Sequence, residues 1–304
     1  MSNTVLAVIE FERFPLEVAT RAAKLAELHE CSLDIVLSDP TIGFLRKSFM
    51  ISADSQQISE TVQQAQREEL DRIVDALSDY DVTVTTSVLQ ERPASDAIVA
   101  RSLEVEPLFV VKGTAYHSAA ERAVFTFNDW QLIRKLDYPL WLVKVHEWRD
   151  EPVVVAAVDP MHPDDEAGLL TRSIVETGKS LARKVGGKLM LVNSYELLEE
   201  VSAWAKLEFK PLKVPMEELQ QKMRDEHRRH LDSLAAATAI DPDAVHLLPG
   251  RTREILPSFA REQGADLVIM GAVARSGLKR RLIGSTAEHV LDHLPCDILI
   301  VRGG

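Results

Sequence analysis

The feature that most restricts the fold of this chain is an internal repeat. Shifting the sequence by 158 positions aligns residues 109–113 with residues 267–271, and the same shift aligns residues 136–143 with residues 294–301. Each aligned stretch contains an apolar run of strand length. A register kept over more than thirty residues indicates a duplicated domain. Near the start of each copy the offset is 149, which loops of different length would explain.

Within each half, short runs rich in Val, Ile and Leu alternate with stretches whose apolar residues recur at helical spacing. The expected strands are residues 5–9, 33–37, 82–88, 108–111 and 140–145 in the first half and 153–158, 189–193, 245–248, 267–270 and 298–301 in the second. The expected helices are residues 16–29 and 59–77, then 165–185, 216–236, 252–263 and 285–293.

Nearly continuous apolar strands joined by helices predict a parallel sheet covered on both faces. We therefore expect an α/β fold of two tandem doubly wound domains, residues 1–148 and 149–304. In such folds a ligand binds beyond the carboxyl ends of the strands, where the strand order reverses.

The amino-acid composition makes several classes of protein improbable, among them membrane and secreted proteins. The 304 residues suffice for two domains with their own cores, and 46% hydrophobic with 27% charged residues is typical of a soluble globular protein. No stretch approaches the roughly 20 apolar residues of a membrane helix, and the N-terminus lacks a signal segment. We therefore expect a cytoplasmic protein without a membrane partner.

Two cysteines without a CxxC pair predict neither a disulfide framework nor a structural zinc. The formal net charge of −12 disfavours nucleic acid as a partner, because binding it requires a concentrated basic surface. A single nucleotide or another small molecule needs only a few N–H groups and cations.

A glycine-containing segment in the second half predicts an anion site. Gly271 follows the apolar run 267–270, and Gly284, Ser285 and Thr286 precede a helical stretch. A strand, a loop and small hydroxyl residues at a helix start would gather unpaired backbone N–H groups around one point. We expect phosphate groups to bind there.

The spacing of this segment resembles the nucleotide-binding signature of the universal stress protein family, in which Gly, two residues, Gly and nine residues precede Gly-Ser or Gly-Thr. Gly271, Gly284 and Ser285 fit, while Ala274 replaces the second glycine. The resemblance implies that ATP, with Mg²⁺, binds in the second half. Binding would be weak or absent because alanine lacks the conformational freedom of glycine.

The resemblance also implies which residues surround the nucleotide. These are Ala157, Val158, Asp159, Asn193, Met270, Gly271, Ala274, Gly284, Ser285 and Thr286. Asp159 would lie beside the ribose and the metal-bound phosphates; the alternative is that it caps a helix beginning near Pro163. Met270 would lie along the adenine and ribose, or it packs in the core, and Asn193 would neighbour the base.

The first half has lost this phosphate loop. Thr126, Phe127 and Asn128 occupy the place of the Gly-Ser-Thr triplet, and Glu10 occupies the place of Asp159. The sequence of residues 112–139 resembles that of the E-type tandem universal stress proteins of bacteria. The resemblance implies a degenerate, structural first domain, a pseudo-two-fold pairing of the strands near 140–145 and 298–301, and further association into a homodimer.

No catalytic set and no phosphate-binding P-loop is recognisable in the sequence. His227 and His230 are expected on a helix surface rather than at a metal. Lys279, Arg280 and Arg281 either close over phosphates or form a solvated face. The apolar stretch 195–216 is a cover for the sheet, a cavity for an apolar ligand, or a partner surface.

The leading hypothesis is a cytoplasmic stress-response protein, a non-enzymatic ATP-binding or signalling module with its site in the second domain. Two alternatives remain open: a slow ATP hydrolase of the same superfamily, and a binder of an apolar small molecule in the second domain.

Overall fold

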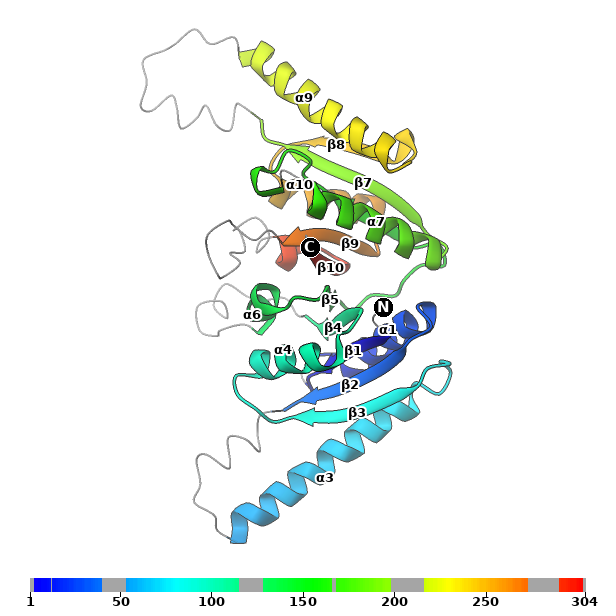
Figure 1. Ribbon diagram of the computed structural model, residues 1–304, viewed down its shortest axis with the longest axis vertical. Coiled ribbons are helices and arrows are strands. Elements are labelled where there is room, and N and C mark those ends of the chain that lie inside the picture. The colour runs from blue at the N-terminus through cyan, green and yellow to red at the C-terminus, as the bar shows by residue number, and fades with distance from the viewer. Residues whose placement is uncertain are drawn as a thin grey trace, which may run out of the picture. The chain divides into compact units, whose positions relative to one another are not determined.

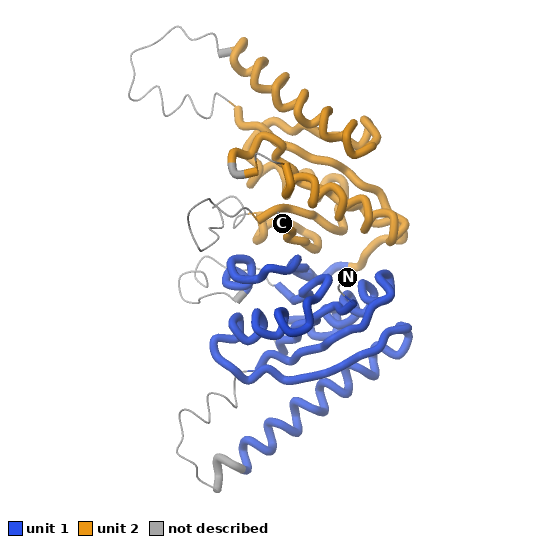
Figure 2. Tube along the Cα trace, in the orientation of Figure 1, with its two compact units in different colours: residues 1–146 blue, residues 147–304 orange. Residues whose placement is uncertain are grey.

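A computed structural model describes residues 3–11, 13–39, 53–114, 128–165, 168–197, 216–272 and 290–302. The chain divides into two compact units, unit 1 (Met1–His146) and unit 2 (Glu147–Gly304), coloured separately in Figure 2. Each unit is an α/β structure whose strands form a parallel sheet, as Figure 1 shows. The predicted fold class, α/β with doubly wound parallel sheets, is confirmed.

Unit 1 contains five strands and, among its described residues, four helices. The strands are β1 (Thr4–Ile9), β2 (Ser32–Ser38), β3 (Val84–Leu89), β4 (Phe109–Gly113) and β5 (Leu140–Val143). The helices are α1 (Pro15–Leu28), α3 (Ala53–Asp75), α4 (Ala94–Val105) and α6 (Asn128–Lys135). The strand order is β3-β2-β1-β4-β5, and all neighbours run parallel.

Unit 2 repeats this plan. Its strands are β6 (Val153–Ala157), β7 (Lys188–Tyr195), β8 (Val245–Pro249), β9 (Leu267–Ala272) and β10 (Asp297–Arg302). Its described helices are α7 (Leu169–Lys184), α9 (Met216–Ala237) and α10 (Thr252–Gln263), with short 3₁₀ turns at Pro163–Asp165 and Pro242–Ala244. The strand order is β10-β9-β6-β7-β8, again parallel throughout.

The central strands form because their side chains are apolar on both faces. Residues 5–9 of β1 and residues 267–269 of β9 are completely inaccessible to solvent. In unit 2, α7 approaches one face closely, since a Cβ placed on Gly178 would lie 2.9 Å from the Leu189 side chain. On the other face His246 of β8 contacts Phe259 of α10. Helices therefore cover both faces of the sheet, as the sequence predicts.

The strand order reverses once in each unit. From β6 the chain adds β7 and β8 on one side, and it then crosses back to place β9 and β10 on the other. The carboxyl ends of β6 and β9 consequently lie side by side, with Ala156 paired to Ile269. We call this edge the switch point of unit 2; the carboxyl ends of β1 and β4 form the switch point of unit 1.

Several sequence predictions fall outside the described residues. They concern Ala274, the Lys279–Arg281 run, the Gly284–Thr286 triplet, Thr126, Phe127 and most of the apolar stretch 195–216. The pairing of the two terminal strands concerns the arrangement of the units relative to each other and stays a prediction.

Candidate functional site

Asp159 lies at the switch point of unit 2, two residues beyond the end of β6. Its side chain is exposed, and its Oδ1 accepts a hydrogen bond from the Met161 N–H at 3.2 Å. Its Oδ2 accepts no hydrogen bond from any described residue. Asp159 does not cap a helix, so the structural alternative considered for it is wrong. One carboxylate oxygen is free for a ligand at the place where doubly wound sheets bind one.

Gly271 near the end of β9 allows α7 to approach this edge. A Cβ placed on Gly271 would lie 2.6 Å from Cδ2 of Leu170, closer than side-chain carbon atoms approach each other. The preceding residue, Met270, is partly exposed and does not belong to the buried core. Glycine therefore lets the strand and the helix pack here without displacing the Leu170 side chain.

Asp165 holds the N-terminus of α7 beside Gly271. Its two carboxylate oxygens accept the Leu170 N–H at 3.0 Å, the Thr171 N–H at 2.8 Å and the Thr171 hydroxyl at 2.7 Å. Partial burial alone would raise the pKa of Asp165, but these hydrogen bonds outweigh burial and lower the pKa below its ordinary value. Asp165, rather than Asp159, satisfies the free donors of the first helical turn.

Asn193 lies on β7 beside the switch point with its side-chain amide fully engaged. Its Nδ2 donates to the Val158 carbonyl at 2.8 Å, its Oδ1 lies 3.0 Å from Nδ1 of His227, and the residue is 3% exposed. The amide therefore ties the end of β6 to α9. That Asn193 neighbours the base stays a prediction, and in the structure its side chain positions Val158.

His227 is not the solvated surface residue that the sequence suggested. It is partly buried on α9, where its ring contacts Asn193 and lies 5.9 Å, centroid to centroid, from the ring of Tyr195. Helical spacing could not reveal this, because the partners of His227 come from β7. Only the polar Asn193 at the end of an apolar strand signalled that a buried partner was needed.

The switch point of unit 1 holds a network of four charges. The Lys112 ammonium, completely buried, lies 2.7 Å from Oε2 of Glu10 and 2.8 Å from Oδ1 of Asp129. Arg13 bridges the same two carboxylates, at 3.1 Å from Glu10 and 2.9 Å from Asp129. Thr114 donates a further hydrogen bond to Asp129 at 3.3 Å. We call Glu10, Arg13, Lys112 and Asp129 the charge network.

The charge network cannot be recognised from the sequence alone. Its members come from the ends of β1 and β4 and the start of α6, so only the fold brings them together. One signal was available: Lys112 interrupts the apolar strand 109–111, and a lysine there must be paired because an unpaired buried charge is very costly.

Comparison with known proteins shows which family unit 2 resembles. The model of the universal stress protein family matches residues 152–302. Unit 2 contains a universal stress protein domain. Among curated relatives, the chain is similar to a universal stress protein E homolog of Haemophilus influenzae, with 26% identity over 99% of this chain and 97% of that protein. It is also similar to universal stress protein E of Escherichia coli K12, with 27% identity over 73% of this chain and 69% of that protein.

Solved structures agree on the fold. A putative universal stress protein from Pseudomonas aeruginosa UCBPP-PA14 superposes with a TM-score of 0.66 and 20% identity, covering 99% of this chain and 93% of that chain. The family model and the curated relatives confirm the resemblance to universal stress proteins of the E type that the sequence indicated.

Several implied contacts of the universal stress protein domain stay predictions. Ala157, Val158, Asp159, Met270 and Gly271 do lie together at the switch point. Ala274, Gly284, Ser285 and Thr286 lie outside the described residues, so the structure does not place the phosphate loop.

In the part of the chain that the structure describes, no cluster of three or more His, Cys, Asp or Glu side chains is arranged to hold a metal ion. None of the helices described there has the length and apolarity that crossing a membrane requires.

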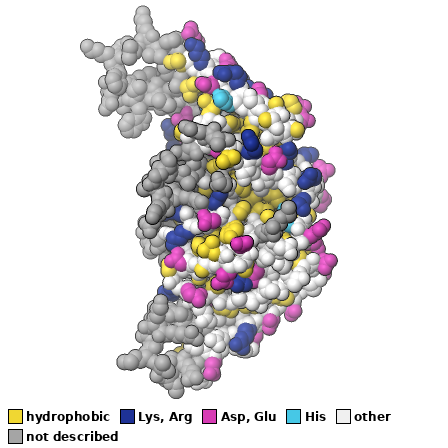
Figure 3. Space-filling model, viewed as in Figure 1, with side chains coloured by type: hydrophobic (Ala, Val, Ile, Leu, Met, Phe, Trp, Pro, Cys, Tyr) yellow, Lys and Arg dark blue, Asp and Glu magenta, His cyan; other side chains and the backbone are white. Residues whose placement is uncertain are grey.

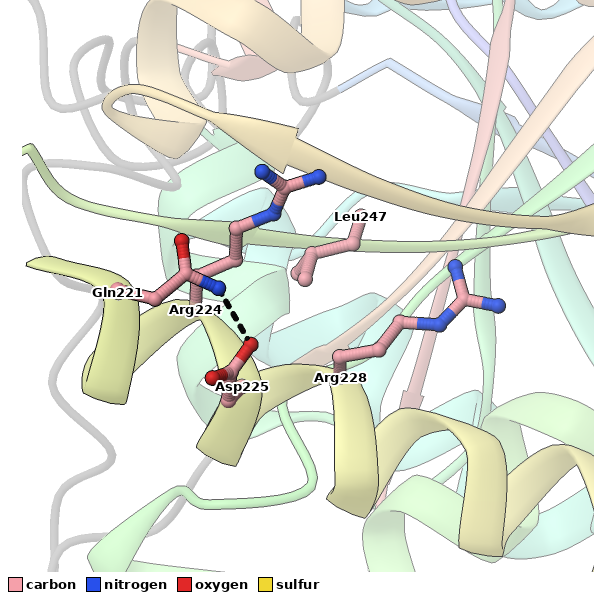
Figure 4. Close-up of a pocket in the computed structure, with 5 residues that line it drawn as sticks. All are labelled: Gln221, Arg224, Asp225, Arg228 and Leu247. Atoms are coloured by element: carbon pink, nitrogen blue, oxygen red, sulfur yellow. Dashed lines mark hydrogen bonds between the residues drawn. The ribbon is translucent and has the colours of Figure 1, made fainter.

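A separate pocket opens between α9 and β8 in the same domain. It has a volume of about 440 Å³ and is lined by Gln221, Arg224, Asp225, Arg228 and Leu247 (Figure 4). It is formed by the edge strand β8 and by α9, and none of the predicted nucleotide contacts lines it.

Proposed function

We propose that this chain is a cytoplasmic stress-response protein whose universal stress protein domain binds ATP at the switch point of unit 2. The observation that carries the proposal is the free, exposed carboxylate oxygen of Asp159 beside the end of β9. The family match and the E-type relatives support it. The two cysteines, both buried free thiols, fit a reducing compartment.

The residues at the switch point fit a nucleotide with its metal. Asp159 would accept hydrogen bonds from the ribose hydroxyls or from water on a phosphate-bound Mg²⁺, which is a hard cation that prefers oxygen ligands. Ala157 and Met270 would flank the nucleoside, and Gly284, Ser285 and Thr286 would supply N–H and hydroxyl donors to the phosphates. The bound Mg²⁺ would neutralise the phosphate charge.

We propose that the domain binds ATP without rapid turnover. Fast hydrolysis needs a residue that positions or activates water next to the γ-phosphate. The acid that we place at the switch point is Asp159. In our proposal it contacts the ribose or the bound metal and does not activate water next to the γ-phosphate. Slow hydrolysis stays the rival hypothesis, and release of ADP by the purified protein decides between the two.

Calorimetric titration with ATP and Mg²⁺ tests the proposal. We expect saturable binding to the full chain, weakened about tenfold or more by Asp159→Asn, because hydrogen bonds to a charged group are stronger than neutral ones. The matched control is Asp150→Asn, which removes the same charge from an exposed position of unit 2. Binding that is absent in the wild type, or equally weakened by the two variants, would refute the proposal. Co-purification of an apolar compound in place of nucleotide would favour the other alternative.

A further inference from the structure

Helix α9 presents two arginines, one turn apart, to the pocket beside β8. Arg224 and Arg228 both line the pocket, and Figure 4 shows their guanidinium groups on the side of the helix that faces β8, with Leu247 between them. Like charges four residues apart on a helix repel each other and destabilise it. At these exposed positions the repulsion is weak, and an anion bound near both groups would relieve it.

The two guanidinium groups keep most of their donors available. Arg224 makes no hydrogen bond or ion pair with any described residue. Arg228 donates from Nε to Asp232 at 2.9 Å, which fixes the side chain and leaves its terminal nitrogens without a partner among the described residues. On the surface drawn in Figure 3, basic and acidic side chains are interspersed, and pairing of opposite charges is common elsewhere in the chain. Arg224 lacks such a pair among the described residues, a property that it shares with other exposed basic residues such as Arg67 and Arg229.

The rest of the lining consists of one acidic, one amide and one apolar side chain. Asp225 is the one acidic residue of the lining, and its carboxylate accepts a hydrogen bond from the Gln221 amide at 2.7 Å. Leu247 is the register partner of Asn193, so its side chain is on the sheet face that α9 covers, while His246 contacts α10 on the other face. The pocket thus combines two arginines, one carboxylate that the Gln221 amide engages, and an apolar wall, so its positive charges outnumber its negative charge.

We propose that Arg224 and Arg228 form a second anion site, which binds the phosphate group of a small phosphorylated molecule. A guanidinium group offers parallel N–H donors that match two oxygens of a phosphate, and two such groups can share one tetrahedral anion. A planar carboxylate presents its two oxygens in one plane and satisfies one group better than two. The pocket, of about 440 Å³, has room for such a molecule, and its polar lining residues are exposed to solvent.

This site is independent of the proposed nucleotide site. It is made by α9 and the edge strand β8, whereas the switch point lies between β6 and β9. Its residues are all described, and none of them belongs to the predicted nucleotide contacts. Either site can therefore exist without the other, and the experiment must separate them.

Titration of the full chain with inorganic pyrophosphate, followed by NMR of the arginine Nε–H groups, tests the proposal. The Gly284→Phe variant is used as background, because it removes the predicted phosphate loop from competition. We expect saturable binding that shifts the Arg224 and Arg228 signals. Arg224→Gln and Arg228→Gln should each weaken binding about fivefold or more.

Arg229→Gln is the matched control, since Arg229 is an exposed neighbour on the same helix that does not line the pocket. It should change the affinity less than twofold. Arg224→Lys, which keeps the charge but loses the paired donors, should weaken binding nearly as much as Arg224→Gln. Equal effects of the Arg224 and Arg229 variants, or no saturable binding in the background variant, would overturn the proposal.

Discussion

At the switch point of unit 1, Lys112 lies completely buried between two carboxylates, whereas at the matching position of unit 2 Met270 is partly exposed. The acidic residues that follow β1 and β6 differ in the same way. Glu10 pairs with Lys112 and Arg13, while Asp159, its counterpart, is exposed and keeps one oxygen free of described partners. Two sheets of the same strand order thus hold different chemistry at the same edge.

The comparison indicates how a doubly wound unit can dispense with a ligand. In unit 1 the positive charges of Lys112 and Arg13 balance Glu10 and Asp129, so the polar groups at the switch point are satisfied within the chain. In unit 2 the exposed Asp159 has no such internal cation among the described residues. We therefore expect the stability of unit 1 to be independent of nucleotide and that of unit 2 to increase with it.

The largest expected effect comes from Lys112→Met, which gives unit 1 the residue found at position 270 of unit 2. The substitution leaves Glu10 and Asp129 close together without their buried cation, and breaking a buried pair in this way costs about 3–5 kcal/mol. Chemical unfolding monitored by hydrogen exchange in β1 and β4 measures the loss.

Lys135→Met is the control for this change. Lys135 forms an ion pair with Asp96 at 2.6 Å, but the two side chains are 36% and 53% exposed, so its loss should cost less than about 1 kcal/mol. Equal destabilisation by the two variants would mean that the charge network contributes no more than a surface ion pair.

The second effect compares the matched glycines. A Cβ on Gly113 would collide with the backbone carbonyl oxygen of Arg13, whereas a Cβ on Gly271 meets the Leu170 side chain, which can rotate away. We expect Gly113→Ala to cost about 3 kcal/mol and Gly271→Ala about 1 kcal/mol. Thermal unfolding of both variants checks the order, and the reverse order would contradict the packing described for the two edges.

A third effect concerns affinity at the proposed nucleotide site. Ala274 stands where the signature has glycine, and a strained or crowded loop residue costs about 1–3 kcal/mol. Ala274→Gly should therefore tighten ATP binding by roughly 5- to 150-fold, and the wild type should purify largely empty of nucleotide. Calorimetry measures the first result and mass spectrometry the second. Stoichiometric ATP in untreated protein would show that Ala274 is harmless.

The smallest expected effect comes from the capping of α7, which differs from that of α1 in unit 1. Asp165 accepts the free N–H groups of α7, but α1 begins without a side-chain cap. Asp165→Asn should destabilise unit 2 by about 1 kcal/mol at neutral pH. Because folding lowers the pKa of Asp165, this stabilisation is present above its ordinary pKa of 3.8 and disappears as the pH falls through the lower folded value.

Unfolding of the wild type and Asp165→Asn between pH 3 and pH 7 measures this difference. The two stability curves should converge at the acidic end. A difference that grows as the pH falls would show that the hydrogen bonds of Asp165 do not favour its charged form.

Much of the fold could be predicted because its signal is local. The apolar runs 5–9 and 267–270 and the helix 252–263 follow from composition and periodicity over short windows. The strand predicted at residues 82–88 begins two residues and ends one residue too early, since β3 is Val84–Leu89 and has no buried residue that would mark its limits.

The site was less predictable because its contacts are not local. The strand pattern and the family resemblance placed Asp159 and Gly271 at the same edge of the sheet, but no pattern along the chain linked Lys112 with Asp129 or Asn193 with His227. Each of these pairs joins two elements that are far apart in sequence. A polar residue inside an apolar strand shows that a partner is needed, and only the fold shows which residue it is.

Photolabelling with 8-azido-ATP, followed by peptide mapping, tests most directly whether the two switch points differ in function. The full chain is labelled in the presence of Mg²⁺ and digested, with unmodified ATP as competitor. We expect competable label only in peptides of unit 2, next to β6, β7 or β9, and none next to β1 or β4. Competable label in unit 1, alone or equal to that in unit 2, would contradict the account.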